Sequence, residues 1–354
     1  LEGSPVDFSY GLLRAVERSL WGDVEVSYVC VEQGRELLGM LPVYFGTNIE
    51  FMALMPEAIK GGYASMVEHL GLGQAYRVAV AGSLMSDRGF VPLLPGCARA
   101  EVLDRMIAAL DEIAREQRLH LTIVKDVHQD FPGIDRFRAA SFVECHSLPT
   151  VRVDTDFSST DEYVSRLTPN GRSNARRVLK KAKREFRMRF VSDYAELMPR
   201  IYPLLRATYL KAPVKLEELP PRFVIDCASV TPPSSELLVC ERGDRIVGAY
   251  LIFFHKGQQL NKRVGIDYAD PQSPLIYNAL NIHSLLRAAE RGIGLSYLGQ
   301  TSYTPKLRLG GQLEDQFLFI KGHRLSTRLS LPLQRRWSLR FRAADVADAV
   351  KRGA

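Results

Sequence analysis

Two stretches of the chain share one pattern of apolar and polar positions. Residues 29–45 read VCVEQGRELLGMLPVYF, and residues 238–254 read LVCERGDRIVGAYLIFF. When the two are aligned, two pairs of glycines fall in register: Gly34 with Gly243, and Gly39 with Gly248. Each stretch is an apolar run, a polar turn that contains glycine, and a second apolar run. This order predicts a β-hairpin in each half of the chain.

A predicted helix and a predicted strand also occur in both halves. Residues 99–124 have the apolar spacing of an amphipathic helix, followed by the strand LHLTIV. Residues 273–298 have the same order, with Ser273 as the expected N-cap, Pro274 in the first turn and the strand LSYLG at the end. We therefore expect the α/β class in the α+β sense, with two tandem domains that each contain a mixed central sheet flanked by helices.

The expected domain boundary lies near residue 150. The first domain, residues 1–150, carries a Gly-rich insertion around residues 46–97. Within it, the segment GGYASMVEHLGLG (residues 61–73) lacks the glycine spacing of a dinucleotide-binding loop. The second domain, residues 151–354, contains the most basic part of the chain.

That basic part is the segment RSNARRVLKKAKREFRMRF, which begins at Arg172. A capping box at Ser159 and Glu162 predicts a short helix before it, and Pro169-Asn170-Gly171 predicts a break between the two. Over residues 172–187 the apolar residues fall on one helical face, which predicts a helix docked by one side. The basic residues form two strips beside that face: Arg172, Arg176, Lys180, Lys183 and Arg187, and then Arg177, Lys181 and Arg184.

The charge of this helix has two interpretations. Charged strips are commonly solvated helix faces. However, like charges four residues apart repel, and Glu185 is the single acid in the segment, so an anion would relieve the repulsion. The chain of 354 residues has a formal net charge of +7 and a pI of about 9.1, which agrees with an anionic partner. A second basic cluster, residues 324–342 with Trp337 and Phe341, either extends an RNA surface or packs at the C-terminus with solvated arginines.

Composition also indicates the cellular compartment and gives no sign of a membrane segment or a metal site. The five cysteines are scattered and form no CxxC pair, and the start of the chain has no basic-then-apolar leader, so we expect a protein of the reducing cytoplasm. No apolar run reaches the 18 residues of a transmembrane segment. The seven histidines show neither HxxxH nor HExxH spacing, and we predict no metal site.

The order of elements in the second half resembles a known group. A basic helix is followed by a pair of strands, the strand QLNKRVGI, a helix opened by SPLIYNAL, the strand LSYLGQ and the loop TSYTPKLRLGG. This order resembles the Fem-like branch of the GNAT acyltransferase superfamily, which includes aminoacyl-tRNA-dependent peptidoglycan-bridge transferases and BioF2-like acetyltransferase domains. The resemblance covers most of residues 155–320, and it implies two GNAT-like domains with the catalytic cleft in the second.

One departure from the superfamily concerns the donor. GNAT enzymes that use acetyl-CoA typically bind its pyrophosphate with a glycine-containing turn at a helix N-terminus. The corresponding stretch here, IDYADPQSPLIYNAL, has no glycine between Asp267 and Ala279. The resemblance therefore favours aminoacyl-tRNA as the donor substrate, with no separate cofactor, and keeps acyl-CoA as the alternative. The basic residues Arg172, Arg176, Arg177, Lys180, Lys183 and Arg187 are the expected donor contacts.

The resemblance also indicates site residues. It places Lys306 beside the acyl donor, where an ammonium can stabilise an oxyanion or bind a phosphate, and Tyr303 where it can orient the substrate or pass on a proton. Asp267 is a candidate to accept from or deprotonate the amine. Arg263, Tyr268 and Gln300 are expected to contact substrate. Ordinary surface or packing roles remain the alternative for each of these residues.

The expected function is amide-bond formation by acyl transfer onto an amine. The acceptor is a small molecule or a peptidyl amine, and the first-domain insertion is expected to lie on the acceptor side. Two alternatives remain: an acyl-CoA-dependent N-acyltransferase, and a non-catalytic protein that binds RNA or an anionic membrane.

Overall fold

The computed structural model describes residues 5–19, 24–47, 77–84, 86–212, 218–230, 233–325, 327–329, 331–332, 335 and 346. In this part the chain forms two compact units, and neither is one continuous stretch. The first unit is built from segments within residues 24–148 and 315–335. The second is built from residues 5–19 and 149–314, together with residue 346.

These units differ from the predicted domains, residues 1–150 and 151–354, at both ends of the chain. Residues 5–19 group with the second half, and the chain returns to the first unit at Asp315. The return at Asp315 is explained by β13 (Gln316–Gly322), which pairs with two strands of the first unit. The predicted segment 61–73 and most of the second basic cluster, including Trp337 and Phe341, lie outside the described residues.

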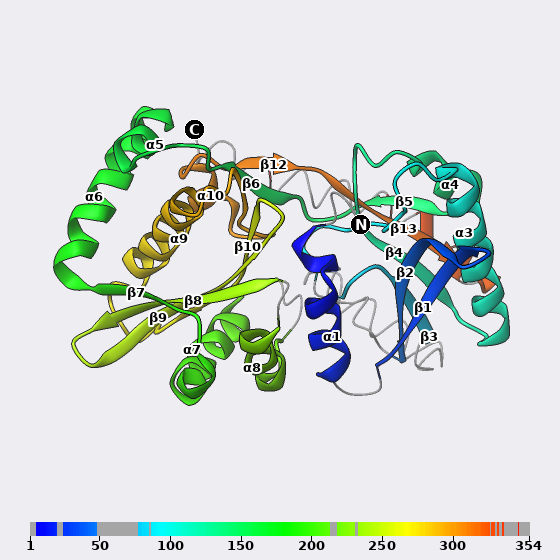
Figure 1. Cartoon of the computed structure of the whole chain (residues 1–354), viewed down its shortest axis with the longest axis horizontal. Coiled ribbons are helices and arrows are strands. Elements are labelled where there is room, and N and C mark those ends of the chain that lie inside the picture. Colours follow the sequence, from blue (N-terminus) through cyan, green and yellow to red (C-terminus); the bar gives the residue numbers. More distant parts are fainter. Residues whose placement is uncertain are drawn as a thin grey trace. The chain divides into compact units, whose positions relative to one another are not determined.

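The first unit contains a six-stranded mixed sheet in the order β1-β2-β3-β4-β13-β5. Among its described strands, the β3–β4 pair alone is parallel. The elements, shown in Figure 1, are β1 (Glu25–Gln33), β2 (Glu36–Thr47), β3 (Arg77–Ala81), α3 (Arg99–Glu116), β4 (Leu121–His128), α4 (Ile134–Ala139), β5 (Val143–His146) and β13 (Gln316–Gly322).

The second unit contains a seven-stranded mixed sheet in the order β12-β6-β11-β10-β9-β8-β7. Of the strand pairs that the structure describes here, β10–β11 alone is parallel. Its strands are β6 (Thr150–Asp154), β7 (Arg187–Val191), β8 (Ser234–Arg242), β9 (Arg245–His255), β10 (Gln258–Ile266), β11 (Leu295–Tyr297) and β12 (Gln312–Glu314). Its helices are η1 (Val6–Phe8), α1 (Tyr10–Arg18), α5 (Thr160–Arg166), α6 (Pro169–Glu185), η3 (Ala195–Leu197), α7 (Met198–Lys211), α8 (Pro221–Ser229), α9 (Ser273–Glu290) and α10 (Tyr303–Leu307).

The predicted repeat is confirmed by both hairpins. Gly34 and Gly243 have φ of +66° and +57°, a turn conformation that glycine adopts without strain. In each hairpin the register shifts after the residue opposite the second glycine, between Val31 and Glu32 and between Cys240 and Glu241. The two halves therefore share a β-bulge as well as a turn.

The second glycine of each hairpin lies under a helix. A Cβ at Gly39 would lie 2.6 Å from Met106 of α3, and a Cβ at Gly248 would lie 2.5 Å from Ile276 of α9. The repeated glycine is therefore explained by close helix–sheet packing. The same contacts place α3 and α9 in equivalent positions on their sheets.

The two faces of the second sheet are covered by different helices. Gly248 faces α9, whereas a Cβ at Gly265 would lie 2.8 Å from the backbone nitrogen of Leu205 in α7. These glycines sit at positions of opposite side-chain direction on paired strands, because Gly265 lies opposite Ala249 and not opposite Gly248. Helices α9 and α6 accordingly cover one face and α7 the other (Figure 1).

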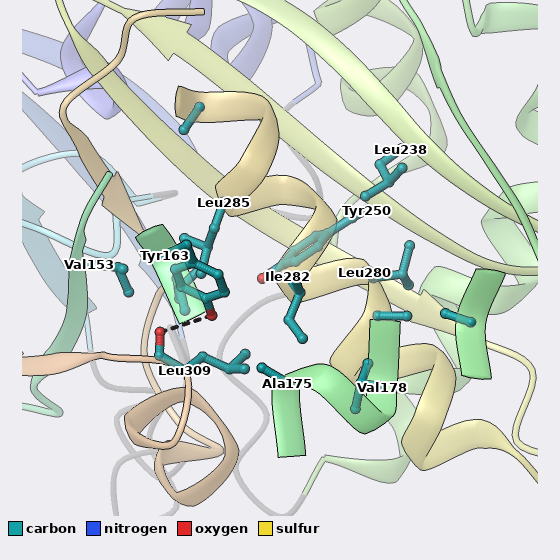
Figure 2. Close-up of a cluster of buried hydrophobic side chains, with 14 of the residues drawn as sticks. Val153, Tyr163, Ala175, Val178, Leu238, Tyr250, Leu280, Ile282, Leu285 and Leu309 are labelled. Carbon is teal, nitrogen blue, oxygen red and sulfur yellow. Dashed lines mark hydrogen bonds between the residues drawn. The ribbon is translucent and has the colours of Figure 1, made fainter. Parts of the chain in front are cut away.

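The basic helix is docked as predicted, but its ends differ. Its apolar face, with Ala175, Val178 and Ala182, is buried against the core that α9 also joins (Figure 2). The helix begins at Pro169, since Thr168 caps it by accepting the Gly171 N–H and proline is well placed in a first turn. The predicted break at Pro169-Asn170-Gly171 is therefore wrong, and the chain turns at Leu167 and Thr168.

Candidate functional site

The candidate site of the second unit lies where two parallel strands part. β10 and β11 pair only over Gln258–Leu260 and Leu295–Tyr297. β10 then continues to Ile266 without β11 beside it. The chain after Tyr297 pairs instead with β6: the Leu298 N–H donates to the Val151 carbonyl, and the Val151 N–H donates to the Gly299 carbonyl. In open α/β sheets, the carboxyl ends of strands that part are the usual place for a ligand.

Asn261 marks the point of parting. Its Nδ2 donates to the Tyr297 carbonyl at 3.2 Å, and the side chain is 2% exposed. Among the described residues no donor reaches its Oδ1. Lys262, the next residue, is the extra residue of a β-bulge, and its side chain is also buried. A buried acceptor without a protein partner is expected to bind water or a ligand.

The loop after β11 has an unusual backbone. Gly299, Thr301 and Ser302 all have positive φ, at +71°, +62° and +49°. Left-handed backbone is costly for residues other than glycine, and most so for a β-branched residue such as Thr301. Lys306, which is 4% exposed, donates from Nζ to the carbonyls of Gly299 and Gln300 at 3.1 and 2.9 Å.

Tyr277 of α9 lies near this loop and near the end of β10, since Ser302 and Tyr268 both influence its ionisation. The Asn281 side chain donates from Nδ2 to the Tyr277 carbonyl at 2.8 Å. Burial raises the pKa of the Tyr277 phenol above its ordinary value, because the charged phenolate is disfavoured where water is excluded. Tyr250 extends the network by donating to Asn281 at 3.4 Å.

Sequence reasoning missed Tyr277, Asn281, Asn261 and Ser302. Tyr277 and Asn281 lie four residues apart in a helix that its apolar stripe alone was sufficient to predict. The available signal was the polar pair at i and i+4 on an otherwise buried helix, because such a pair needs partners from another element.

The predicted site residues divide into two groups. Tyr303 and Lys306 lie in α10, directly after the loop that follows β11, and Gln300 belongs to that loop. Tyr268 follows the end of β10. The Tyr303 hydroxyl donates to the Pro149 carbonyl at 3.0 Å. Tyr268 also contacts Lys211, whose Nζ lies 3.9 Å from the ring centroid. Arg263 lies on β10 just past the point of parting, and its side chain is half-buried.

Asp267 is held on the other side of β10. Its carboxylate accepts from the Ala269 N–H and from Arg245 of β9, at 3.0 and 2.8 Å. Because β9 and β11 flank β10 on opposite sides, this carboxylate faces away from the loop that follows β11. Its predicted role toward the amine stays a prediction, and it requires that the pair with Arg245 opens.

The N-terminus of α9 has no backbone donor to offer an anion. The first-turn proline and Pro271 have no N–H, and all other backbone N–H groups from Ala269 to Ile276 are bonded within the turn. Asp270 accepts the Gln272 N–H and an Arg242 N–H at 2.8 and 2.6 Å. The predicted N-cap Ser273 is wrong, since Gln272 is the N-cap and Asp270 supplies the side-chain acceptor just before the helix.

The equivalent end of α3 in the first unit is open. A hollow of about 340 Å³ lies there, lined by residues that include Gln33, Glu36, Glu101 and Arg105. In the second unit the matching hairpin residues are Arg242 and Arg245, which pair with Asp270 and Asp267. The two halves of the repeat therefore differ at this helix end, because side chains of opposite charge fill it only in the second unit.

The exposed face of α6 is a cationic surface without acids. Arg176, Lys180, Lys181 and Lys183 are exposed, and no acidic side chain among the described residues pairs with them. Two of the residues predicted to contact the donor do not belong to this exposed helical face. Arg172 donates to the Leu167 carbonyl at 2.8 Å and so caps α5. Arg187 is exposed but is the first residue of β7, since the helix ends at Glu185.

Other kinds of site are not supported by the described residues. They contain no group of three His, Cys, Asp or Glu side chains arranged to hold a metal ion. Within the same residues, no helix combines the length and the apolar character that crossing a bilayer requires.

Solved structures share this fold. FemX matches with a TM-score of 0.61 and 12% identity, over 94% of this chain and 95% of its own. The C-terminal DUF2156 domain of a putative lysylphosphatidylglycerol synthetase from Agrobacterium fabrum matches with a TM-score of 0.57 and 11% identity, over 91% of this chain and 89% of its own. L-PGS from Bacillus licheniformis matches with a TM-score of 0.54 and 10% identity, over 92% of this chain and 96% of its own.

The likeness to these structures is one of fold. The sequence matches no protein-family model and no curated protein. The resemblance to the Fem-like GNAT branch is confirmed at the level of the fold, and so is the predicted class of two mixed sheets flanked by helices.

Proposed function

We propose that the chain is an acyltransferase that forms an amide bond, taking an aminoacyl group from aminoacyl-tRNA and passing it to an amine. The fold, shared with FemX and L-PGS, supports acyl transfer as the reaction class. The parting of β10 and β11 supports a site there, because a buried acceptor without a donor among the described residues, a buried phenol and a loop with left-handed backbone lie near it.

The observation that carries the choice of donor is the closed N-terminus of α9. A CoA pyrophosphate needs free backbone N–H groups or cations at such a helix end. Here the N–H groups are bonded internally, and the arginines at this end, Arg242 and Arg245, already pair with carboxylates. A donor with a different anion-binding region is therefore favoured.

The exposed face of α6 is suited to be that region. Its cations lie in rows three and four residues apart, a spacing of about 5–6 Å that is close to the distance between successive phosphates. The helix also begins beside the turn that follows Lys306: a Cβ at Gly171 would lie 2.7 Å from the Arg308 carbonyl, and Tyr163 of α5 donates to Leu309 at 3.2 Å (Figure 2). A polyanion bound along α6 therefore leads toward the candidate site.

The same helix argues against a membrane surface as its main partner. Interfacial helices place apolar side chains on the face that meets the lipid. In α6 the apolar side chains are those buried or half-buried against the core, and its exposed face is basic and polar. The cationic face is therefore better suited to phosphates in water.

The proposed step needs position and hydrogen-bond donors, and no covalent intermediate on the protein. The amine nitrogen attacks the ester carbonyl carbon, the C–N bond forms, and the C–O bond to the ribose breaks. The amine proton ends on the ribose oxygen. Tyr277 and Ser302 carry hydroxyl groups near the parting of the strands that are able to donate hydrogen bonds. Direct roles for Lys306, Tyr303 and Asp267 in this step stay predictions, as do substrate contacts of Arg263, Tyr268 and Gln300.

The test is binding of aminoacylated total tRNA, deacylated tRNA and acetyl-CoA to the purified chain at about 50 and 200 mM salt. We expect micromolar binding to both tRNA samples that weakens steeply with salt, and no binding of acetyl-CoA. Binding of acetyl-CoA without tRNA would replace the proposal by an acyl-CoA-dependent N-acyltransferase. Binding of tRNA with no transfer to any amine acceptor would leave an RNA-binding protein.

A further inference from the structure

The role of Lys306 follows from what its ammonium contacts. The side chain is 4% exposed, and Nζ donates to two consecutive carbonyls, those of Gly299 and Gln300. A buried ammonium is stable only where its donors are satisfied, and carbonyl oxygens satisfy them without neutralising the charge. The lysine is therefore built into the loop that follows β11.

The contacted loop contains two of the three described non-glycine residues of the second unit that have left-handed φ. Thr301 and Ser302 follow the two bound carbonyls directly, and both have left-handed φ, at +62° and +49°. Such conformations persist only where surrounding contacts hold them. One such contact lies at the start of the loop, since the Gly299 carbonyl also accepts the Val151 N–H at 3.2 Å. At the other end, Tyr277 of α9 lies near Ser302.

The other end of Lys306 is held as firmly as its ammonium. Its carbonyl accepts the N–H groups of Leu309 and Gly311, each at 3.1 Å. A Cβ at Gly311 would lie 2.7 Å from that carbonyl oxygen, so the backbone approach is close. Lys306 thus joins the turn after α10 to the loop after β11 through one residue.

We propose that Lys306 is a positioning residue: it holds the Gly299–Ser302 loop in its left-handed conformation, and so fixes the hydroxyl of Ser302 and the edge of the acyl-transfer site, without contacting the reacting atoms. The assignment of this site to acyl transfer rests on the proposed function, whereas the contact between Lys306 and the loop does not. This role differs from the direct electrostatic role that the sequence resemblance implies.

The test is a rescue experiment. Lys306→Met keeps the length and the burial of the side chain and removes its donors. We expect kcat for aminoacyl transfer to fall by about 100-fold, because a displacement of about 1 Å costs that much in a transfer site. The affinity for tRNA, which depends on α6, stays within about twofold. Adding Thr301→Gly is expected to recover about tenfold of the lost kcat, since glycine adopts the left-handed conformation without help.

A second measurement needs no substrate. Amide hydrogen exchange at Leu298 and Val151, which pair across the start of the loop, is expected to rise in Lys306→Met and to fall again with Thr301→Gly. Lys125→Met is the matched control, because Lys125 also binds a carbonyl, that of Ser86, but in the first unit. This control should leave exchange at Leu298 and Val151 unchanged.

The outcomes separate the two proposals. Unchanged exchange in Lys306→Met would overturn the loop-holding role. Increased exchange together with a kcat that Thr301→Gly does not improve would overturn the positioning role and favour direct chemistry by the ammonium. Absence of aminoacyl transfer in the unmodified chain would refute the proposed function, and the exchange measurement would still decide whether Lys306 holds the loop.

Discussion

Changing Arg176, Lys180 and Lys183 together to glutamine is expected to weaken binding of aminoacyl-tRNA on the order of 30-fold at low salt. These residues are exposed on α6 and have no acidic partner among the described residues. Each cation that meets a phosphate releases a counterion, and the slope of log K against log salt changes by about 0.7 to 0.9 for each contact. The slope should therefore become shallower by about 2 to 3. Filter binding or fluorescence titration over a salt series measures both quantities.

A control for net charge removes three arginines elsewhere in the second unit, of which Arg206 and Arg222 pair with Glu218 and Asp226. Arg200, Arg206 and Arg222 are exposed on α7 and α8, on the face of the sheet opposite α6. Their replacement by glutamine should leave the salt slope within about 0.5 of the unmodified protein, since they are not expected to meet phosphates. Equal losses in the two triple variants would show that net charge, and not the α6 surface, drives binding. An unchanged slope in the α6 variant would show that the basic face of this helix is solvated and does not bind phosphates.

Gly248→Val is expected to lower the free energy of unfolding of the second unit by about 3 kcal/mol. A Cβ at this position lies 2.5 Å from Ile276 Cγ2 and 3.1 Å from Leu280 Cδ1, and both side chains are fully buried in the core under α9. Valine adds two further carbons to this contact, so α9 must move away from β9. Urea denaturation, followed by signals that report on each unit separately, measures the loss.

Two comparisons make this prediction specific. Gly294→Val is the control, because a Cβ there meets nothing within 4 Å, and its cost should stay within about 0.5 kcal/mol. Gly39→Val tests the repeat. A Cβ there would lie 2.6 Å from Met106 Cε, 2.8 Å from Leu93 Cδ2 and 3.0 Å from Val102 Cγ1. Because the nearest of these atoms ends a flexible side chain that can move aside, the cost in the first unit should be smaller than at Gly248. A larger loss at Gly39 than at Gly248 would contradict this account.

Regular elements could be predicted from the sequence because their signals are local. The hairpins were correct because glycine and polar residues mark each turn between apolar runs, and Gly34 and Gly243 do adopt positive φ. The docked face of α6 was correct because apolar residues three and four apart must share a helical face. The start of α6 was wrong for a local reason too, since Pro169 suits the first turn of a helix as well as it suits a break.

The candidate site was predictable only in part. The absence of a glycine before α9 could be read from the sequence. The absence of free backbone N–H groups for an anion could not, because it depends on the hydrogen bonds that occupy every such group from Ala269 to Ile276. The resemblance indicated the loop with Tyr303 and Lys306. It did not indicate that Tyr277 of α9 contacts this loop, because the two lie 25 residues apart along the chain and only the packing of α9 brings them together.

Local order along this chain is thus sufficient to establish the two hairpins, the helices that pack on them and the basic face of α6. Periodicity and turn residues act over a few positions, and they are the same in any fold. The tertiary structure alone decided which charged side chains face solvent and which bind another group of the protein. Arg172 caps a neighbouring helix, Asp267 pairs with Arg245, and Lys306 holds a strained loop. The physical reason is that each of these partners is set by the path of the backbone in space, and residue type alone does not specify a partner.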